Sequence, residues 1–146
     1  MQIIRIKKLS ESAILPKYAT KLSAGVDIHA NLHENIVIFP GKSAIIPSGI
    51  AIALPEGYEA QVRPRSGLAA KNSITVLNSP GTVDCDYRGE IKVILINHGR
   101  DEFTVEHGMR IAQIVISKYE QVNFVEANLD ADETDRGAKG FGSTGI

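Results

Sequence analysis

The chain has 146 residues and a net charge of −1, because its 16 Lys and Arg residues nearly balance its 17 Asp and Glu residues. This length fits one domain, and the charge balance argues against a nucleic-acid binder with a broad basic face. Hydrophobic residues make up 43% of the chain and charged residues 23%, which is typical of a folded globular domain rather than a disordered chain.

Cysteine content and hydropathy indicate in which cellular compartment the protein is expected. A single cysteine, Cys85, excludes a disulfide within the chain and suits a reducing environment. The first ten residues carry cations inside their apolar stretch, which argues against a signal peptide. The most apolar segment, residues 43–55, contains Pro and Gly and is too short to span a bilayer. We therefore expect a cytoplasmic protein with no membrane partner.

Short alternating or β-branched runs predict strands along most of the chain, at residues 3–6, 26–28, 36–39, 44–46, 50–54, 58–62, 91–96, 103–105, 111–116 and 122–125. Gly, Pro or Asn lies in most of the gaps between them. One stretch, residues 66–72, reads as a helix of about two turns with Ser66 as its N-cap. The pattern predicts an all-β barrel or sandwich.

The last twenty residues differ from the rest. Residues 127–136 are polar and acidic, four glycines follow, and such a stretch cannot bury enough apolar surface to order itself. It nevertheless contains two cations, Arg136 and Lys139, and one aromatic residue, Phe141. It reads either as a solvated terminus or as an arm that orders on an anionic ligand, with Phe141 available for stacking. We expect a β-barrel domain over residues 1–126 and a flexible arm over residues 127–146.

A strand runs into the short helix at Arg65, Ser66 and Gly67. Free N–H groups at a helix start attract phosphate, and Ser66 adds a hydroxyl while Arg65 adds positive charge. An ordinary capped helix with a surface arginine explains this segment equally well.

Residues 78–90 lie between two predicted strands and predict a hairpin. Asp84 is a candidate general base, and Tyr87 offers a flat wall three residues later. The backbone of a hairpin can also pair with the edge of a nucleobase. Taken alone, the segment reads better as an acidic surface turn.

Residues 108–113 begin another strand, in which Gln113 could position a water molecule and Arg110 could be structural. A strand with a polar edge is the simpler interpretation. The four histidines are not clustered as metal ligands are, so we assign them no catalytic role. No phosphate-binding loop of the Gly-x-x-x-x-Gly-Lys type occurs.

Five ordered segments together make the sequence resemble the trimeric dUTPase family (deoxyuridine triphosphate nucleotidohydrolases). They are AGVDI at 24–28, PRSGLA at 64–69, GTVDCDYRGE at 81–90, GMRIAQ at 108–113 and RGAKGFGSTG at 136–145. The resemblance covers nearly the whole chain. Met109 stands where the family usually has Asp, and Lys139 where it usually has Gly. We expect Met109 to loosen a local turn and Lys139 to suit a triphosphate ligand.

The resemblance implies a β jelly roll that assembles as a homotrimer with shared active sites, in which the arm completes a neighbouring site. It implies hydrolysis of dUTP to dUMP and pyrophosphate with Mg²⁺ on the triphosphate. That reaction removes dUTP and supplies dUMP for dTMP synthesis. The expected partners are therefore dUTP and two further copies of the chain, with no nucleic acid and no membrane.

The resemblance also implies roles for individual residues. Asp84 would take a proton from a water molecule that Gln113 helps to hold, and that water would attack the α-phosphorus. Substrate-binding groups would come from several parts of the chain: Arg65, Ser66, Gly67 and Arg136 for the phosphates, Asn78, Thr82 and Val83 for the uracil edge, Tyr87 under the deoxyribose, Phe141 stacked on the base, and Lys92 and Gly142 as further contacts.

Two alternatives remain open from the sequence. A dCTP deaminase resembles the same fold but forms its active site differently, and the Asp84-x-x-Tyr87 arrangement speaks against it. A non-enzymatic trimeric β protein that binds a nucleotide or a protein partner is the other alternative. The presence of every polar residue that the chemistry needs speaks against that one.

Overall fold

The computed structural model describes residues 3–129, 134 and 136–140, and all structural statements refer to these residues. They form eleven strands and one helix. In chain order these are β1 (Arg5–Lys8), β2 (Gly25–His29), β3 (Ile36–Ile38), β4 (Ser43–Pro47), β5 (Ile50–Ala53), β6 (Tyr58–Arg63), α1 (Ser66–Asn72), β7 (Ile74–Val76), β8 (Gly81–Val83), β9 (Lys92–Asn97), β10 (Phe103–Val105) and β11 (Arg110–Lys118).

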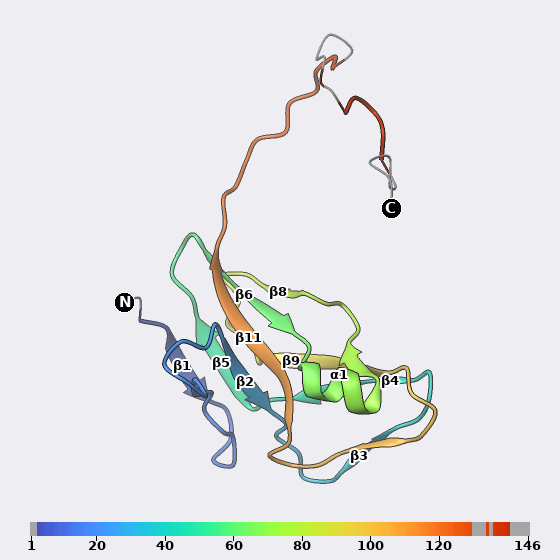
Figure 1. Cartoon of the computed structure of the whole chain (residues 1–146). Coiled ribbons are helices and arrows are strands. Elements are labelled where there is room, and N and C mark those ends of the chain that lie inside the picture. Colours follow the sequence, from blue (N-terminus) through green and yellow to red (C-terminus); the bar gives the residue numbers. More distant parts are fainter. Residues whose placement is uncertain (1–2, 130–133, 135, 141–146) are drawn as a thin grey trace.

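The strands form small antiparallel sheets that wrap around one core, which is the all-β jelly roll that was expected (Figure 1). The largest sheet has the order β2-β11-β6-β8, and a second sheet has the order β4-β9-β7. β1 pairs with β5, and β10 pairs with β3. β11 runs through the middle of the molecule, with β2 on one side and β6 on the other.

The core is aliphatic and consists of Ile, Val, Leu and Ala side chains that the strands bury. In β9 the side chains of Val93, Leu95 and Asn97 point inward and those between them are less buried, which is the two-residue period of a half-buried strand. Buried members of this core include Ile28, Ile46, Ile74, Ile91, Val93, Leu95 and Ile111. Among the described residues the polar Ser48 and Asn97 are also buried, and the Asn97 side chain donates to the carbonyl oxygens of Ile38 and Asp101.

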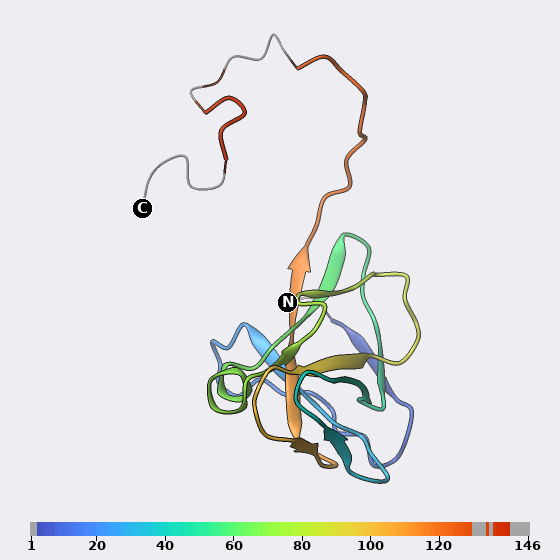
Figure 2. The ribbon, with the colours of Figure 1, turned by 90° about the vertical axis from the view of Figure 1, so that its right-hand side faces the viewer.

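Two expected strands need correction. The first strand is shifted to Arg5–Lys8 from the predicted 3–6, because its pairing with β5 decides which residues join the ladder. Residues 122–125 form no strand. They belong to a segment that leaves the body after β11 and lies apart from it in both views (Figures 1 and 2). A strand needs a neighbouring strand to complete its backbone hydrogen bonds, and residues 122–125 pair with none of the described strands.

Candidate active site

The helix start differs from the expectation. Arg65 is the N-cap residue with an extended backbone, no side chain caps the helix, and Ser66 is the first helical residue rather than the cap. Gly67 follows in an open position where an added Cβ would meet nothing within 4 Å. α1 therefore presents its first turn to the surface, and the side chain that organises this corner is Arg65.

Asp27 on β2 holds two arginines. Its Oδ1 accepts a hydrogen bond from Arg65 Nε at 2.9 Å, and its Oδ2 lies 3.4 Å from Arg110 Nη1. Arg65 also donates to the Arg110 carbonyl oxygen at 3.3 Å. These contacts agree with a structural role for Arg110, which stays a prediction, while Asp27 was missed as a site residue. The available signal was the lone carboxylate inside the apolar segment at 24–28.

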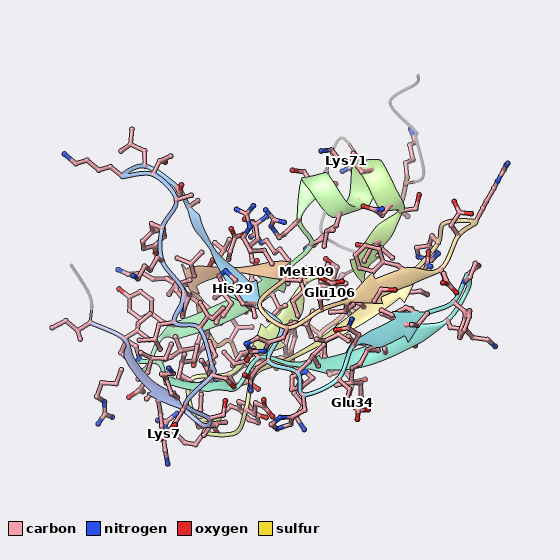
Figure 3. All side chains as sticks on the ribbon, turned by 90° about the horizontal axis from the view of Figure 1, so that it is seen from below. Lys7, His29, Glu34, Lys71, Glu106 and Met109 are labelled. Atoms are coloured by element: carbon pink, nitrogen blue, oxygen red, sulfur yellow. The ribbon has the colours of Figure 1, made fainter. Side chains whose placement is uncertain are left out.

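His29 lies next to this cluster and pairs with Arg110 in the sheet (Figure 3). Burial lowers the pKa of its imidazole; Asp27 opposes that shift, and the positive charges of Arg110 and Arg65 reinforce it. Its Nδ1 is buried without a hydrogen-bond partner in the structure. Burial and the neighbouring arginines therefore favour the neutral imidazole, and the absence of a catalytic role for His29 stays a prediction.

Residues 77–91 connect β7 and β9, which are an antiparallel pair, so the segment read as a hairpin does join two paired strands. The connection is long and contains its own strand, β8, which pairs with β6 in the other sheet. After β8 the chain turns, and the backbone N–H of Tyr87 donates to the Asp84 carbonyl oxygen at 3.2 Å. Arg88 Nη1 closes the outside of this turn by donating to the carbonyl oxygens of Cys85 and Tyr87.

This connection borders a cavity of about 330 Å³. Five of the predicted site residues line it: Thr82, Val83, Asp84, Tyr87 and Lys92. The remaining lining residues are Ile45, Glu90, Ile91 and Ile94, so the cavity has an apolar floor and a polar rim. Asn78 does not line the cavity, but its Nδ2 would lie 3.2 Å from a Cβ built on Gly81, at the start of β8.

The Tyr87 ring is fixed at its far end. Its hydroxyl donates to the Glu90 carbonyl oxygen at 3.0 Å. The Glu90 carboxylate in turn accepts a hydrogen bond from the Gly49 N–H at 2.8 Å and lies 3.8 Å from Lys92 Nζ. Sequence reasoning gave Glu90 no role, and its place at the end of the 78–90 segment was the only available signal. Glu90 ties the wall of the cavity to the turn between β4 and β5.

The remaining predicted residues lie elsewhere. Arg65, Ser66, Gly67 and Gln113 do not line the cavity that contains Asp84. The Gln113 side-chain amide donates to the Pro64 carbonyl oxygen at 2.9 Å, which holds the turn that precedes α1. The structure therefore presents two groups of site residues, one around Asp84 and one around Arg65.

Arg136 and Lys139 are exposed and belong to one turn, in which the Lys139 N–H donates to the Arg136 carbonyl oxygen. Phe141 and Gly142 lie outside the described residues.

Met109 lies in a hydrogen-bonded turn (Figure 3). Its N–H donates to the Glu106 carbonyl oxygen, its carbonyl oxygen accepts from the Ala30 N–H, and its side chain packs against the core. The loosening expected from Met109 in place of Asp stays a prediction.

Within the described residues, no group of three or more His, Cys, Asp and Glu side chains is arranged to hold a metal ion. None of the described helices is both long and apolar enough to cross a membrane.

Comparison with known proteins places these observations in one family. The family model described as dUTPase matches residues 11–145. Deoxyuridine 5'-triphosphate nucleotidohydrolase of Rickettsia bellii is 60% identical over 98% of this chain and 95% of its own length. The enzyme of the same name from Rickettsia felis is 58% identical over 98% of this chain and 97% of its own.

Solved structures agree in fold. The dUTPase of Staphylococcus bacteriophage 80alpha with dUPNHPP is 26% identical, covers 100% of both chains and has a TM-score of 0.90. A variant dUTPase from phage phi11 of S. aureus, described with a structural Mg(II) ion, has a TM-score of 0.77 at 22% identity. It covers 86% of this chain and 97% of its own. The second likeness shows the fold alone.

Proposed function

The chain belongs to the dUTPase family and is a dUTP-hydrolysing enzyme, and we propose that water attacks the α-phosphorus while Asp84 takes its proton. The products are dUMP and pyrophosphate. The observation that carries this proposal is the cavity in which Asp84, Tyr87 and Lys92 meet. It offers a carboxylate, an aromatic face and a cation around one space.

Asp84 suits the role of base because of its position. It directly follows β8, so the pairing of β8 with β6 holds its backbone at the rim of the cavity. A carboxylate is a weak base at neutral pH, so it must act on a water molecule already placed in line with the phosphorus. We propose that Gln113 of a second chain helps to hold that water, because Gln113 does not line the cavity of its own chain.

Recognition of the nucleoside would come from the same connection. The backbone of Thr82 and Val83, with the Asn78 amide, can match the donor and acceptor pattern of uracil. Cytosine presents the opposite pattern at two positions and would leave buried polar groups unpaired. Tyr87 would pack under the deoxyribose, where a ribose 2′-hydroxyl would clash, and Lys92 would add a cation at the rim.

The triphosphate would be held by Arg65, Ser66 and Gly67 at the start of α1. The Asp27 carboxylate fixes the Arg65 side chain, which lowers the entropy lost when Arg65 meets a phosphate oxygen. We take the substrate to be dUTP with Mg²⁺ on its phosphates, and the described residues, which offer no three-ligand cluster, fit an ion that the phosphates carry. When bound, the ion neutralises triphosphate charge.

We propose a homotrimer with shared active sites. The separation of the Asp84 group from the Arg65 group supports this arrangement, because a second chain can supply what the first lacks. Residues 127–146 would act as the arm that completes a neighbouring site, with Arg136, Phe141 and Gly142 contacting the nucleotide. The exposed segment between β11 and this arm supports a reach beyond its own chain (Figure 2). A cytoplasmic location is proposed from the lone cysteine.

A nucleotide panel tests the proposal directly. Purified protein with Mg²⁺ is incubated with dUTP, dCTP, dTTP and UTP, and both pyrophosphate and ammonia are measured. We expect pyrophosphate from dUTP and little product from the other three nucleotides. Ammonia from dCTP would indicate a deaminase instead, and comparable turnover of UTP would contradict the role given to Tyr87.

A further inference from the structure

Gly89 lies directly behind the Tyr87 ring. A Cβ added at residue 89 would overlap Tyr87 Oη and would lie 2.6 Å from Cζ and 3.0 Å from Cε2. Carbon atoms in ordinary contact are about 3.5–4.0 Å apart, so the ring occupies the place where any other residue would carry its side chain. The ring folds back over residue 89, and its hydroxyl reaches the carbonyl of the next residue, Glu90.

The ring links residue 89 to the cavity, because Tyr87 lines the cavity and the hydroxyl end of its ring lies against Gly89. The backbone beyond Gly89 is held by hydrogen bonds. Ile91 N–H donates to the Ile50 carbonyl oxygen, and the Glu90 carboxylate accepts from the Gly49 N–H. A side chain at residue 89 would therefore displace the Tyr87 ring, and with it one wall of the cavity, rather than the backbone.

We propose that Gly89 is a positioning residue for nucleotide recognition, because the absence of a side chain there sets how far the Tyr87 ring stands from the sugar. This inference rests on the proposed place of Tyr87 under the deoxyribose. Gly89 itself touches no substrate. It fixes the width of the cavity by leaving room for the aromatic ring, so the sugar selection attributed to Tyr87 depends on both residues.

The test is Gly89→Ala in three backgrounds: wild type, Tyr87→Phe and Tyr87→Ala. With Tyr or Phe at 87 the added methyl group meets the ring, because Cζ is present in both. We expect KM for dUTP and Kd for a non-hydrolysable dUTP analogue to rise, by at most about 100-fold, which is the order of the loss that a misplacement of roughly 1 Å can cause. With Ala at 87 no ring remains to be displaced, and we expect Gly89→Ala to change neither constant.

The test is whether the effect of the substitution at residue 89 depends on the residue at position 87. An equal rise in KM in all three backgrounds would show that Gly89→Ala distorts the loop itself, and would overturn the proposal. A crystal structure of Gly89→Ala supplies a readout independent of activity, in which the Tyr87 ring should be displaced toward the cavity. An unmoved ring would also overturn the proposal. A wild-type protein that fails to hydrolyse dUTP would instead refute the proposed function, and the ring displacement would still report on Gly89.

Discussion

Arg65 and Asp84 lie toward opposite ends of strand β6: Arg65 comes two residues after its last residue, and Asp84 comes directly after β8, beside its first residues. Val83, just before Asp84, pairs with Ala60, whereas Arg63, two residues before Arg65, pairs with Gln113. Ala60 and Arg63 are three residues apart, which is about 10 Å at 3.3 Å per residue, and Asp84 and Arg65 each lie beyond that span. The proposed base and the arginine proposed to bind phosphate therefore belong to two separate regions of one chain.

Mixing of variant subunits tests whether the two regions of different chains form one active site. Asp84→Asn and Arg65→Ala chains should each form inactive trimers. If a site takes Asp84 from one chain and Arg65 from the next, every mixed trimer contains one complete site. Activity after exchange of subunits should then exceed that of both parents together. Mixed trimers verified by native mass spectrometry that gain no activity would show that each chain builds its own site.

The role of Asp84 can be tested alone. Asp84→Asn keeps the size and polarity of the side chain but removes the base, so kcat for dUTP should fall about 10²- to 10⁴-fold. Affinity for a non-hydrolysable dUTP analogue should change little, which isothermal titration calorimetry measures. Asp86→Asn, two residues away and exposed, is the matched control and should keep its activity. Normal turnover by the Asp84 variant would exclude it as the base.

Tyr87 should determine sugar selection. Removing the ring in Tyr87→Ala should lower the ratio of kcat/KM for dUTP to that for UTP, because the surface that meets a 2′-hydroxyl is gone. Tyr87→Phe keeps the ring and loses only the hydrogen bond to the Glu90 carbonyl oxygen, so it should retain most of the ratio. If the ratio is the same in all three proteins, a different residue rejects ribonucleotides.

Removal of residues 136–146 should leave a folded trimer with a large loss of activity. These residues would supply Arg136 and Phe141 to the proposed site, and the described part of the arm, residues 136–140, is exposed. Thermal unfolding should therefore be unchanged, while kcat/KM for dUTP falls. Full activity of the truncated chain would remove the arm from the mechanism.

His29 should make stability depend on pH. Its pKa is lowered in the folded state, so below its ordinary value of about 6.5 the unfolded chain binds a proton that the folded chain resists. The free energy of unfolding should thus fall as the pH drops from about 6.5 toward the folded-state pKa. Urea unfolding measured at several pH values in this range should show that the free energy of unfolding of His29→Gln depends less on pH than that of the wild type. A nuclear magnetic resonance titration that places His29 at or above 6.5 would contradict this expectation.

Local patterns in the sequence were sufficient to predict much of the fold. The runs at 26–28, 103–105 and 111–116 became β2, β10 and β11 with small changes of boundary, and residues 66–72 became α1. These succeed because backbone preference and alternation of apolar residues are properties of neighbouring positions. The ordered motifs likewise located the proposed base, the aromatic wall and the phosphate-binding corner along the sequence.

Other features depended on contacts between distant residues. Residues 122–125 have the composition of a strand but no pairing strand, and β8 exists because β6 offers its edge. The role of Asp27 came from the approach of β2 to Arg65, which sequence spacing does not show. Tertiary structure likewise decided that the two groups of proposed site residues lie apart and that the Tyr87 ring lies against Gly89. Register between strands sets both, and register is a property of the folded sheet rather than of any local run of residues.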